Sequence, residues 1–248
     1  MKIHHAAAVV AALSVLGGCG GSDAGDPGDP PVQATTYAEV TPPLGSLDSF
    51  QTVELDDSGN TVGRGYEERV TAVGADGSYQ LTQDDPQNQT VTVDGITYHY
   101  DPTVRQYGPT SANNAQSQYT VTLPGGGTAT CVYAVQSGEH ARPFYVGQSW
   151  TTNYTVTCGT VTTAYVSTGT VAAVESITVP AGTFTTLKET TSSSWTTAAG
   201  QKIVEHSDLW MDPSHGFFTV KRVSTYQRSG NVPLHYVTQE TVELQSRH

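Results

Sequence analysis

The sequence predicts an all-β fold, an antiparallel meander that forms a sandwich or an incomplete barrel. Thr, Val and Tyr are abundant, and no segment repeats apolar residues at helical spacing over three turns. Alternation with period two is easier to find, as in Tyr119, Val121 and Leu123. Turn signals such as Asp76-Gly77 and Ala199-Gly200 recur between these runs.

The all-β domain is expected over residues 46–248, a length that suits one sizeable core. Residues 65–81 and 169–187 both run strand, glycine-containing turn, aromatic residue, strand. Two similar halves, 46–116 and 117–248, are therefore an alternative. Any meander with short turns also looks similar to itself, so a single domain is the simpler interpretation.

Residues 1–18 have the three parts of a secretion signal. Lys2 supplies a positive charge, residues 6–16 form an uncharged apolar run, and small residues lead to Cys19. The apolar run of 11 residues is too short to span a bilayer, which takes about 20 residues. We therefore predict a cleaved signal peptide.

Leu16-Gly17-Gly18-Cys19 resembles the lipobox of bacterial lipoproteins. In that family a peptidase cuts before the cysteine, which receives several acyl chains. The resemblance implies lipidation of Cys19 and a membrane partner reached through this anchor. Gly20 stands where Asp would favour the inner membrane, so the resemblance implies the outer membrane. We expect the domain at the periplasmic face, with exposure at the cell surface as the alternative.

Residues 19–45 are rich in Gly, Pro and Asp and offer little to bury. Such a segment cannot offset its own ordering entropy, so we expect a disordered tether. Coil scaling gives it a reach of about 25–30 Å.

The chain carries a net charge of −12, and loss of Lys2 with the signal leaves 10 basic against 23 acidic side chains, or −13. A domain of this charge repels phosphate groups, which argues against nucleic acid as a partner.

With Cys19 assigned to lipid, Cys131 and Cys158 remain, in a compartment where disulfides form. Both lie in alternating strand patterns. A hairpin that sets Cys131 opposite Cys158 also sets Tyr133 opposite Val156, so one register satisfies the disulfide and the apolar face together. The alternative, a cysteine nucleophile, needs basic neighbours that neither position has.

From Gly147 to Tyr226 the chain resembles a recurring module of bacterial envelope proteins of unknown function. The matching segments are Gly147–Trp150, Glu175–Phe184, Leu209–Pro213 and Gly216 with Val220-Lys221. The resemblance implies that Val-Pro-Ala-Gly-Thr-Phe forms a strand–turn–strand corner followed by a hairpin. Related modules are similar to the incomplete barrel of lipoprotein carriers, whose helices cover the concave face; this chain has no candidate helix for that role.

Four aromatic residues are candidates for a ligand-binding groove: Trp150, Tyr154, Trp195 and Trp210. The alternative is that these side chains are simply core, which is the more frequent role of large aromatic residues.

A second cluster, His206, Asp208, Asp212 and His215, offers nitrogen and oxygen ligands of the kind that zinc takes. The same residues also suit an exposed hairpin, so we assign no metal or cofactor.

We likewise assign no catalytic residues. Gly147-Gln148-Ser149-Trp150-Thr151 fails the hydrolase motif at its last position, and Glu67-Glu68 is expected to lie on a solvated edge. Glu175 lies on an apolar face and is expected to pair with Lys188 or Lys221, or to cross a sheet edge.

These observations favour a non-catalytic envelope lipoprotein that binds a small apolar ligand or a peptide on a curved sheet. The alternative is an interaction module that supports an envelope protein complex. A metal-assisted hydrolase is a third hypothesis.

Overall fold

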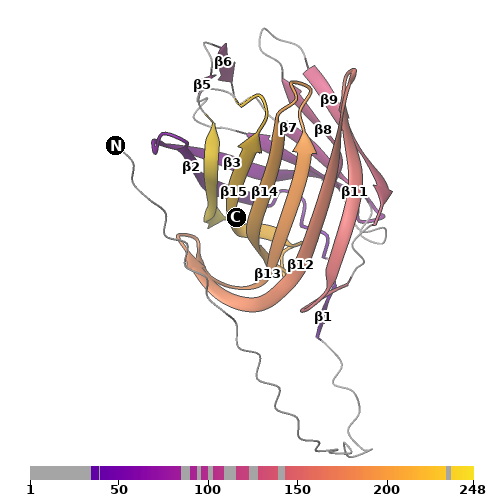
Figure 1. Ribbon diagram of the computed structural model, residues 1–248. Helices are drawn as coiled ribbons and strands as arrows, with labels where there is room; N and C mark the ends of the chain where they lie inside the picture. The colour runs from indigo at the N-terminus through magenta and orange to yellow at the C-terminus, as the bar shows by residue number, and fades with distance from the viewer. Residues whose placement is uncertain are drawn as a thin grey trace, which may run out of the picture. The chain divides into compact units, whose positions relative to one another are not determined.

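Twelve antiparallel strands close into a barrel in the computed structural model of the protein (Figure 1). The structure describes residues 35–38, 40–84, 90–93, 96–99, 103–108, 116–122, 128–138, 143–232 and 236–248, and these contain no helix. The predicted all-β antiparallel meander is confirmed, and its sheet closes on itself. A helix long and apolar enough to cross a membrane is not found in the described part of the chain.

The barrel strands are β2 (Leu47–Asp56), β3 (Thr61–Val73), β4 (Tyr79–Asp84), β7 (Thr103–Tyr107), β8 (Gln116–Thr122), β9 (Thr128–Ser137), β11 (Ser149–Cys158), β12 (Val161–Val179), β13 (Gly182–Thr196), β14 (Lys202–Asp212), β15 (Phe218–Ser229) and β16 (Val237–Arg247). Two small sheets accompany the barrel. One joins β1 (Thr36–Tyr37) to β10 (Phe144–Tyr145), and the other joins β5 (Thr90–Val93) to β6 (Ile96–His99).

The barrel closes because its last strand pairs with its first. Strands β16 and β2 are antiparallel, with Val242 opposite Thr52 and Arg247 opposite Asp48. Beyond the ladder, Leu47 and His248 exchange backbone hydrogen bonds of 2.8 and 2.9 Å. The remaining barrel strands pair in chain order. Strand β4 pairs with β7 and β9 pairs with β11, because the strands between them belong to the two small sheets.

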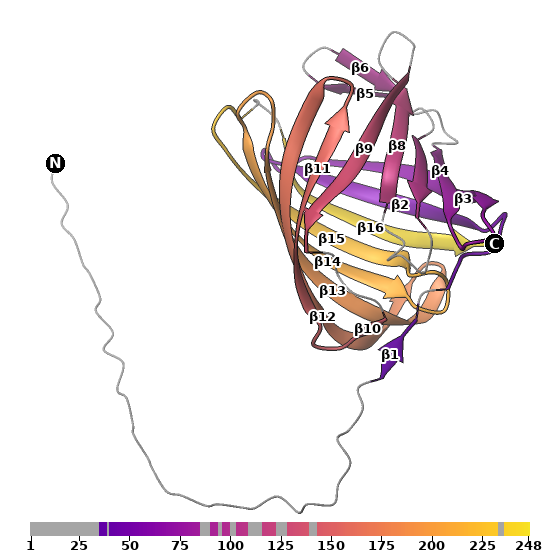
Figure 2. The same ribbon diagram turned by 90° about the vertical axis from the view of Figure 1, so that its right-hand side faces the viewer.

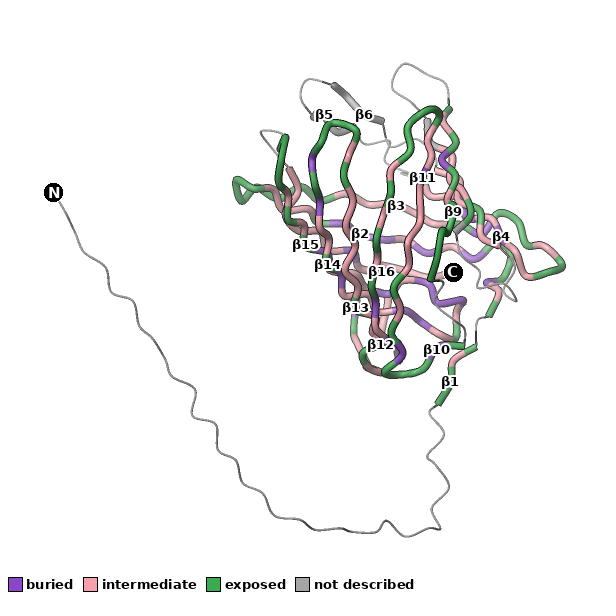
Figure 3. Tube along the Cα trace, turned by 45° about the vertical axis from the view of Figure 1, so that its right-hand side comes forward, coloured by how far each residue is buried: buried purple, intermediate pink, exposed green. Residues whose placement is uncertain are grey.

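The apolar core fills the lower end of the barrel, as drawn in Figure 2, where the turns between β12 and β13 and between β14 and β15 lie. Its three clusters centre on Val220 and Leu244, on Leu187 and Phe217, and on Val70 and Leu81. The strand tips at the opposite, upper rim are exposed (Figure 3). The barrel therefore has a filled end and an end with little core.

The β12–β13 hairpin bends under the filled end (Figure 1). Pro180 and Ala181 form its turn, Gly182 has φ = 136°, and the Ala181 amide donates to the Leu244 carbonyl at 3.2 Å. Val179 is buried against β16 in the core. The strand–turn–strand corner expected at this segment is present.

Part of the segment that we expected to be a disordered tether has a defined place in the fold. Tyr37 in β1 packs against the cluster that contains Phe144, and Pro42 is fully buried. These apolar groups lie within the segment predicted as a tether. The overall composition of that segment is dominated by Gly and Asp, which hides the few residues that can be buried. Cys19, the signal peptide 1–18 and the tether as far as residue 34 lie outside the described residues.

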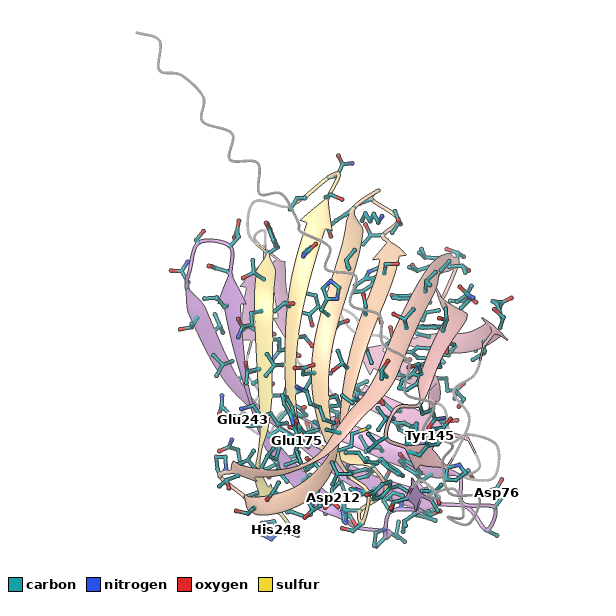
Figure 4. The ribbon with its side chains drawn as sticks, turned by 60° about the horizontal axis from the view of Figure 1, so that its bottom comes forward. Asp76, Tyr145, Glu175, Asp212, Glu243 and His248 are labelled. Carbon is teal, nitrogen blue, oxygen red and sulfur yellow. A yellow bond between two sulfur atoms is a disulfide. The ribbon has the colours of Figure 1, made fainter. Side chains whose placement is uncertain are left out.

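An ionic cluster joins three elements at the filled end. Arg247 donates to both oxygens of Asp48 at 2.8–3.2 Å and to Asp212 at 2.7 Å. Its guanidinium also lies 5.4 Å from the ring centre of Phe184. Figure 4, in which the lower end comes forward, shows Asp212 and the terminal His248 there. We call Asp48, Arg247 and Asp212 the Arg247 cluster.

Candidate functional site

A continuous row of aromatic side chains crosses five neighbouring strands of the barrel, from β8 to β13. The ring centres of successive members lie 5.8, 5.9, 4.9 and 5.3 Å apart. We call this set the aromatic row; its members are Tyr119, Tyr133, Tyr154, Tyr165 and Trp195. All five side chains are partly exposed.

Alternation along the strands places the aromatic row on the inner wall. Val132 and Val166, each one residue from a member of the row, are 46% and 45% exposed on the outer wall. Val156, which shares a face with Tyr154, is 6% exposed. The rings therefore face the barrel interior.

A disulfide between Cys131 and Cys158 lies beside one end of the aromatic row. The two residues are directly opposite in the β9–β11 ladder, with Tyr133 opposite Val156, which is the register that the alternating pattern predicts. The Tyr119 hydroxyl lies 3.7 Å from the Cys158 sulfur. The bridge thus ties together two strands that carry the row.

Burial raises the pKa of the tyrosines in the row. The pKa of Tyr154 rises to about 12, and that of Tyr133 rises further, because each ionised phenolate would lose hydration. The neighbouring Tyr165 raises the pKa of Tyr154, while Arg105 opposes the rise at Tyr133. These hydroxyls stay protonated at neutral pH.

Three Arg–Glu pairs form a charged belt on the inner wall of β2, β3, β7, β15 and β16. They are Arg64–Glu54 at 2.6 Å, Arg105–Glu68 at 3.3 Å, and Arg222–Glu240. Arg105 also donates to Gln83. Each carboxylate is less exposed than its arginine, or about equally exposed, so the pairs shield the acids from water.

A cavity of about 410 Å³ lies between this belt and the core. Arg64, Arg105 and Arg222 line it together with Tyr66, Tyr107 and Phe217. Its wall thus combines cations, aromatic rings and apolar surface, which is a composition for an amphiphilic ligand rather than a purely apolar one.

Glu68 corrects one expectation from the sequence. We expected Glu67-Glu68 on a solvated edge, but the Glu68 side chain is only 13% exposed, lines the cavity and pairs with Arg105. Burial raises the pKa of Glu68 and the Arg105 guanidinium opposes that rise. Charge composition alone could not show that one of two adjacent acids faces inward.

Three of the four aromatic ligand candidates lie on the inner wall. Tyr154 and Trp195 belong to the aromatic row. Trp150 instead covers Gly169 and contacts Phe144 at 6.3 Å between ring centres, next to the core. A Cβ at Gly169 would lie 2.2 Å from the Trp150 ring, so glycine makes room for the indole there.

Trp210 is separated from the other candidates by the barrel wall. Its neighbour Leu209 lines the cavity, so Trp210 faces outward. Its indole nitrogen donates to Glu175 at 2.7 Å, and the Lys188 ammonium lies 4.8 Å from its ring centre. Glu175 therefore pairs with Trp210, whereas Lys188 pairs with Asp208 and Lys221 with Glu243.

The four candidate metal ligands make separate contacts and do not converge. His206 is exposed on β14, and Asp208 pairs with Lys188 at 2.9 Å. Asp212 belongs to the Arg247 cluster, while His215 packs edge-on against Phe218. Among the described residues, no three His, Cys, Asp or Glu side chains are grouped so that they could hold a metal ion.

A shallow groove of about 600 Å³ on β11 to β15 is lined mostly by outward hydroxyls such as Thr168, Thr170 and Thr190. Several of these hydroxyls pair with their neighbours, as Ser149 does with Thr170 at 2.9 Å. The groove therefore presents hydroxyl groups that are already partly satisfied.

Sequence reasoning missed the charged belt and the continuity of the aromatic row. The row had a usable signal, since Tyr119 and Tyr133 each lie in an alternating strand pattern. The belt as a whole had none. Arg64–Glu54 and Arg222–Glu240 join consecutive strands, but Arg105 on β7 meets Glu68 on β3 only in the folded barrel, and nothing in the sequence brings the three pairs together.

Comparisons with known proteins complete the description. No protein-family model and no curated protein matches the chain. Among solved structures, a candidate exported protein with a YMCC-like fold from Bacteroides fragilis matches with a TM-score of 0.49 and 10% identity, over 86% of this chain and 99% of that one. A candidate lipoprotein from Parabacteroides distasonis matches with a TM-score of 0.46 and 12% identity, over 87% of this chain and 100% of that one.

Proposed function

We propose that this chain is a non-catalytic lipoprotein of the bacterial envelope that binds a ligand inside its barrel. The observation that carries the proposal is the two-sided interior. The aromatic row lines one wall, and the charged belt with its cavity of about 410 Å³ lines the other. Pockets that combine aromatic surface with a few placed polar groups are typical ligand sites.

The envelope address rests on the sequence. The signal-like residues 1–18 and the Leu-Gly-Gly-Cys motif support lipidation at Cys19, and Gly20 supports the outer membrane, at the periplasmic face. The disulfide fits an oxidising compartment. A Cys19→Ala variant should lose the acyl mass and remain in the soluble fraction, whereas wild-type protein that lacks acyl mass contradicts the proposed anchor.

The ligand is expected to be amphiphilic. A purely apolar molecule would leave the belt charges facing hydrocarbon, which is costly. A molecule with polar groups can satisfy them. This consideration changes our expectation from a small apolar ligand to one with both kinds of surface, and a peptide remains compatible with it.

Native mass spectrometry of the full-length protein, extracted from its own envelope in detergent, tests the proposal. We expect a co-purifying small molecule that is released on unfolding. A matched sample of the Trp195→Ala variant should carry less of it. Co-purification of an envelope protein, with nothing in the barrel, would instead favour the interaction module.

A further inference from the structure

The aromatic row has the dimensions of a binding track for an elongated molecule. It crosses five strands, and strands in a sheet lie about 4.8 Å apart, so the row extends about 19 Å. All members are partly exposed on the same inner wall. A single small ring would cover only one or two of them.

Three members of the row present phenol hydroxyls to the barrel interior. In the part of the chain that the structure describes, the hydroxyls of Tyr133, Tyr154 and Tyr165 make no hydrogen bond. Burial keeps these phenols protonated, so each can donate a hydrogen bond as well as accept one. Tyr154 and Tyr165 stack with an interplanar angle of 4°, so their ring faces are largely used by each other.

The surrounding charges disfavour an anionic occupant. Glu205 on β14 lies opposite Ser193 of β13, so it brings a carboxylate to the strand next to the Trp195 end of the row. Arg105, near the other end, is already paired with Glu68. The chain as a whole carries a net charge of −12. A polyanion would be repelled here.

An acyl chain also fits poorly. It would cover the phenol hydroxyls without supplying hydrogen-bond partners, and an unpaired buried hydroxyl costs about 1–3 kcal/mol by mutational measures. The occupant must instead combine apolar surface with acceptors, repeated along its length and without net charge.

We infer that the aromatic row binds a neutral linear oligosaccharide. Each sugar unit offers apolar C–H surface to the ring faces that remain exposed, and hydroxyl or ring oxygens to the phenols of Tyr133, Tyr154 and Tyr165. This inference rests on the proposed ligand site and names the chemical class that the site takes.

The test is isothermal titration of the full chain in detergent with maltohexaose, cellohexaose and the hexamer of N-acetylglucosamine. We expect saturable binding of at least one hexasaccharide. Because Trp195 belongs to the row, binding should also change the tryptophan fluorescence of the protein, followed in a parallel titration. A Tyr154→Phe/Tyr165→Phe variant keeps both rings and removes two hydroxyls, so it should bind at least about fivefold more weakly. Tyr145→Phe is the matched control, because Tyr145 is 41% exposed on β10, outside the row (Figure 4), and should leave affinity unchanged.

Three outcomes overturn the inference. The first is no binding of any hexasaccharide to protein that is folded by circular dichroism. The second is binding that the double variant and the Tyr145 control change equally. The third is preference for polyphosphate or for tetra-alanine over the sugars. If one of these outcomes occurs while native mass spectrometry still finds another molecule in the barrel, the oligosaccharide inference fails and the proposed ligand site stands; if the barrel is also empty, both fail.

Discussion

Removal of the Arg247 guanidinium should destabilise the barrel strongly. Asp48 has no exposed side-chain surface, and Asp212 is 9% exposed at its side chain. Arg247→Ala leaves both carboxylates without their shared cation, although Asp212 keeps two hydrogen bonds from Ser214. Loss of one partner from a buried ion pair costs about 3–5 kcal/mol. With an m-value of about 2–3 kcal/mol/M, the urea midpoint should fall by about 1–2.5 M.

Urea unfolding followed by tryptophan fluorescence measures this loss. Lys221→Ala is the matched control, because its pair with Glu243 is about one-third exposed, and such pairs contribute about 0–1 kcal/mol. Arg247→Met keeps apolar contact with Phe184 and separates packing from charge. If Arg247→Ala lowers the midpoint no more than Lys221→Ala does, the Arg247 cluster does not hold the filled end together.

Three further predictions concern the inner wall. Replacing Cys131 and Cys158 together by Ala should lower the free energy of unfolding by about 3.5 kcal/mol for a separation of 27 residues, measured by urea unfolding; no difference from wild type under non-reducing conditions would contradict a bridge. Gly169→Ala should displace Trp150 at a cost of about 1–3 kcal/mol and shift tryptophan emission; an unchanged spectrum and melting curve would show that the indole lies elsewhere. Tyr154 should ionise near pH 12, read as the difference in phenolate absorbance between wild type and Tyr154→Phe. Because the unfolded chain releases this proton near pH 10, its contribution to stability is present below pH 10 and is lost by about pH 12; ionisation near pH 10 in the folded protein would refute burial of the row.

The sequence patterns predicted local structure well, because local structure follows alternation and turn chemistry. The β9–β11 register could be predicted because Cys131 and Cys158 constrain the same ladder as the apolar face. The resemblance implied the corner at Val179–Phe184, and the restricted φ of Pro180 and the positive φ of Gly182 agree with it. Two similar halves stay a prediction, and the described residues from 35 to 248 belong to one compact unit.

Long-range pairing was beyond these patterns. Arg247 and Asp48 are 199 residues apart in the chain, and nothing in either neighbourhood indicates the other. The inward direction of Glu68 could not be predicted either. Glu67 and Glu68 point to opposite faces of β3, and only the register of that strand decides which of them faces the cavity. For the candidate site, alternation placed Tyr154 and Trp195 on suitable faces but could not separate them from Trp210, which the closed wall puts outside.

Strand β16 pairs with β2, although Arg247 and its partner Asp48 are 199 residues apart in the chain. Before that pairing forms, the sheet has two free edges, and free edges are sites where strands from other molecules can add. Contacts between such distant segments also make folding slow. The single β16–β2 pairing therefore removes both free edges at once, and any change that weakens it exposes both edges together.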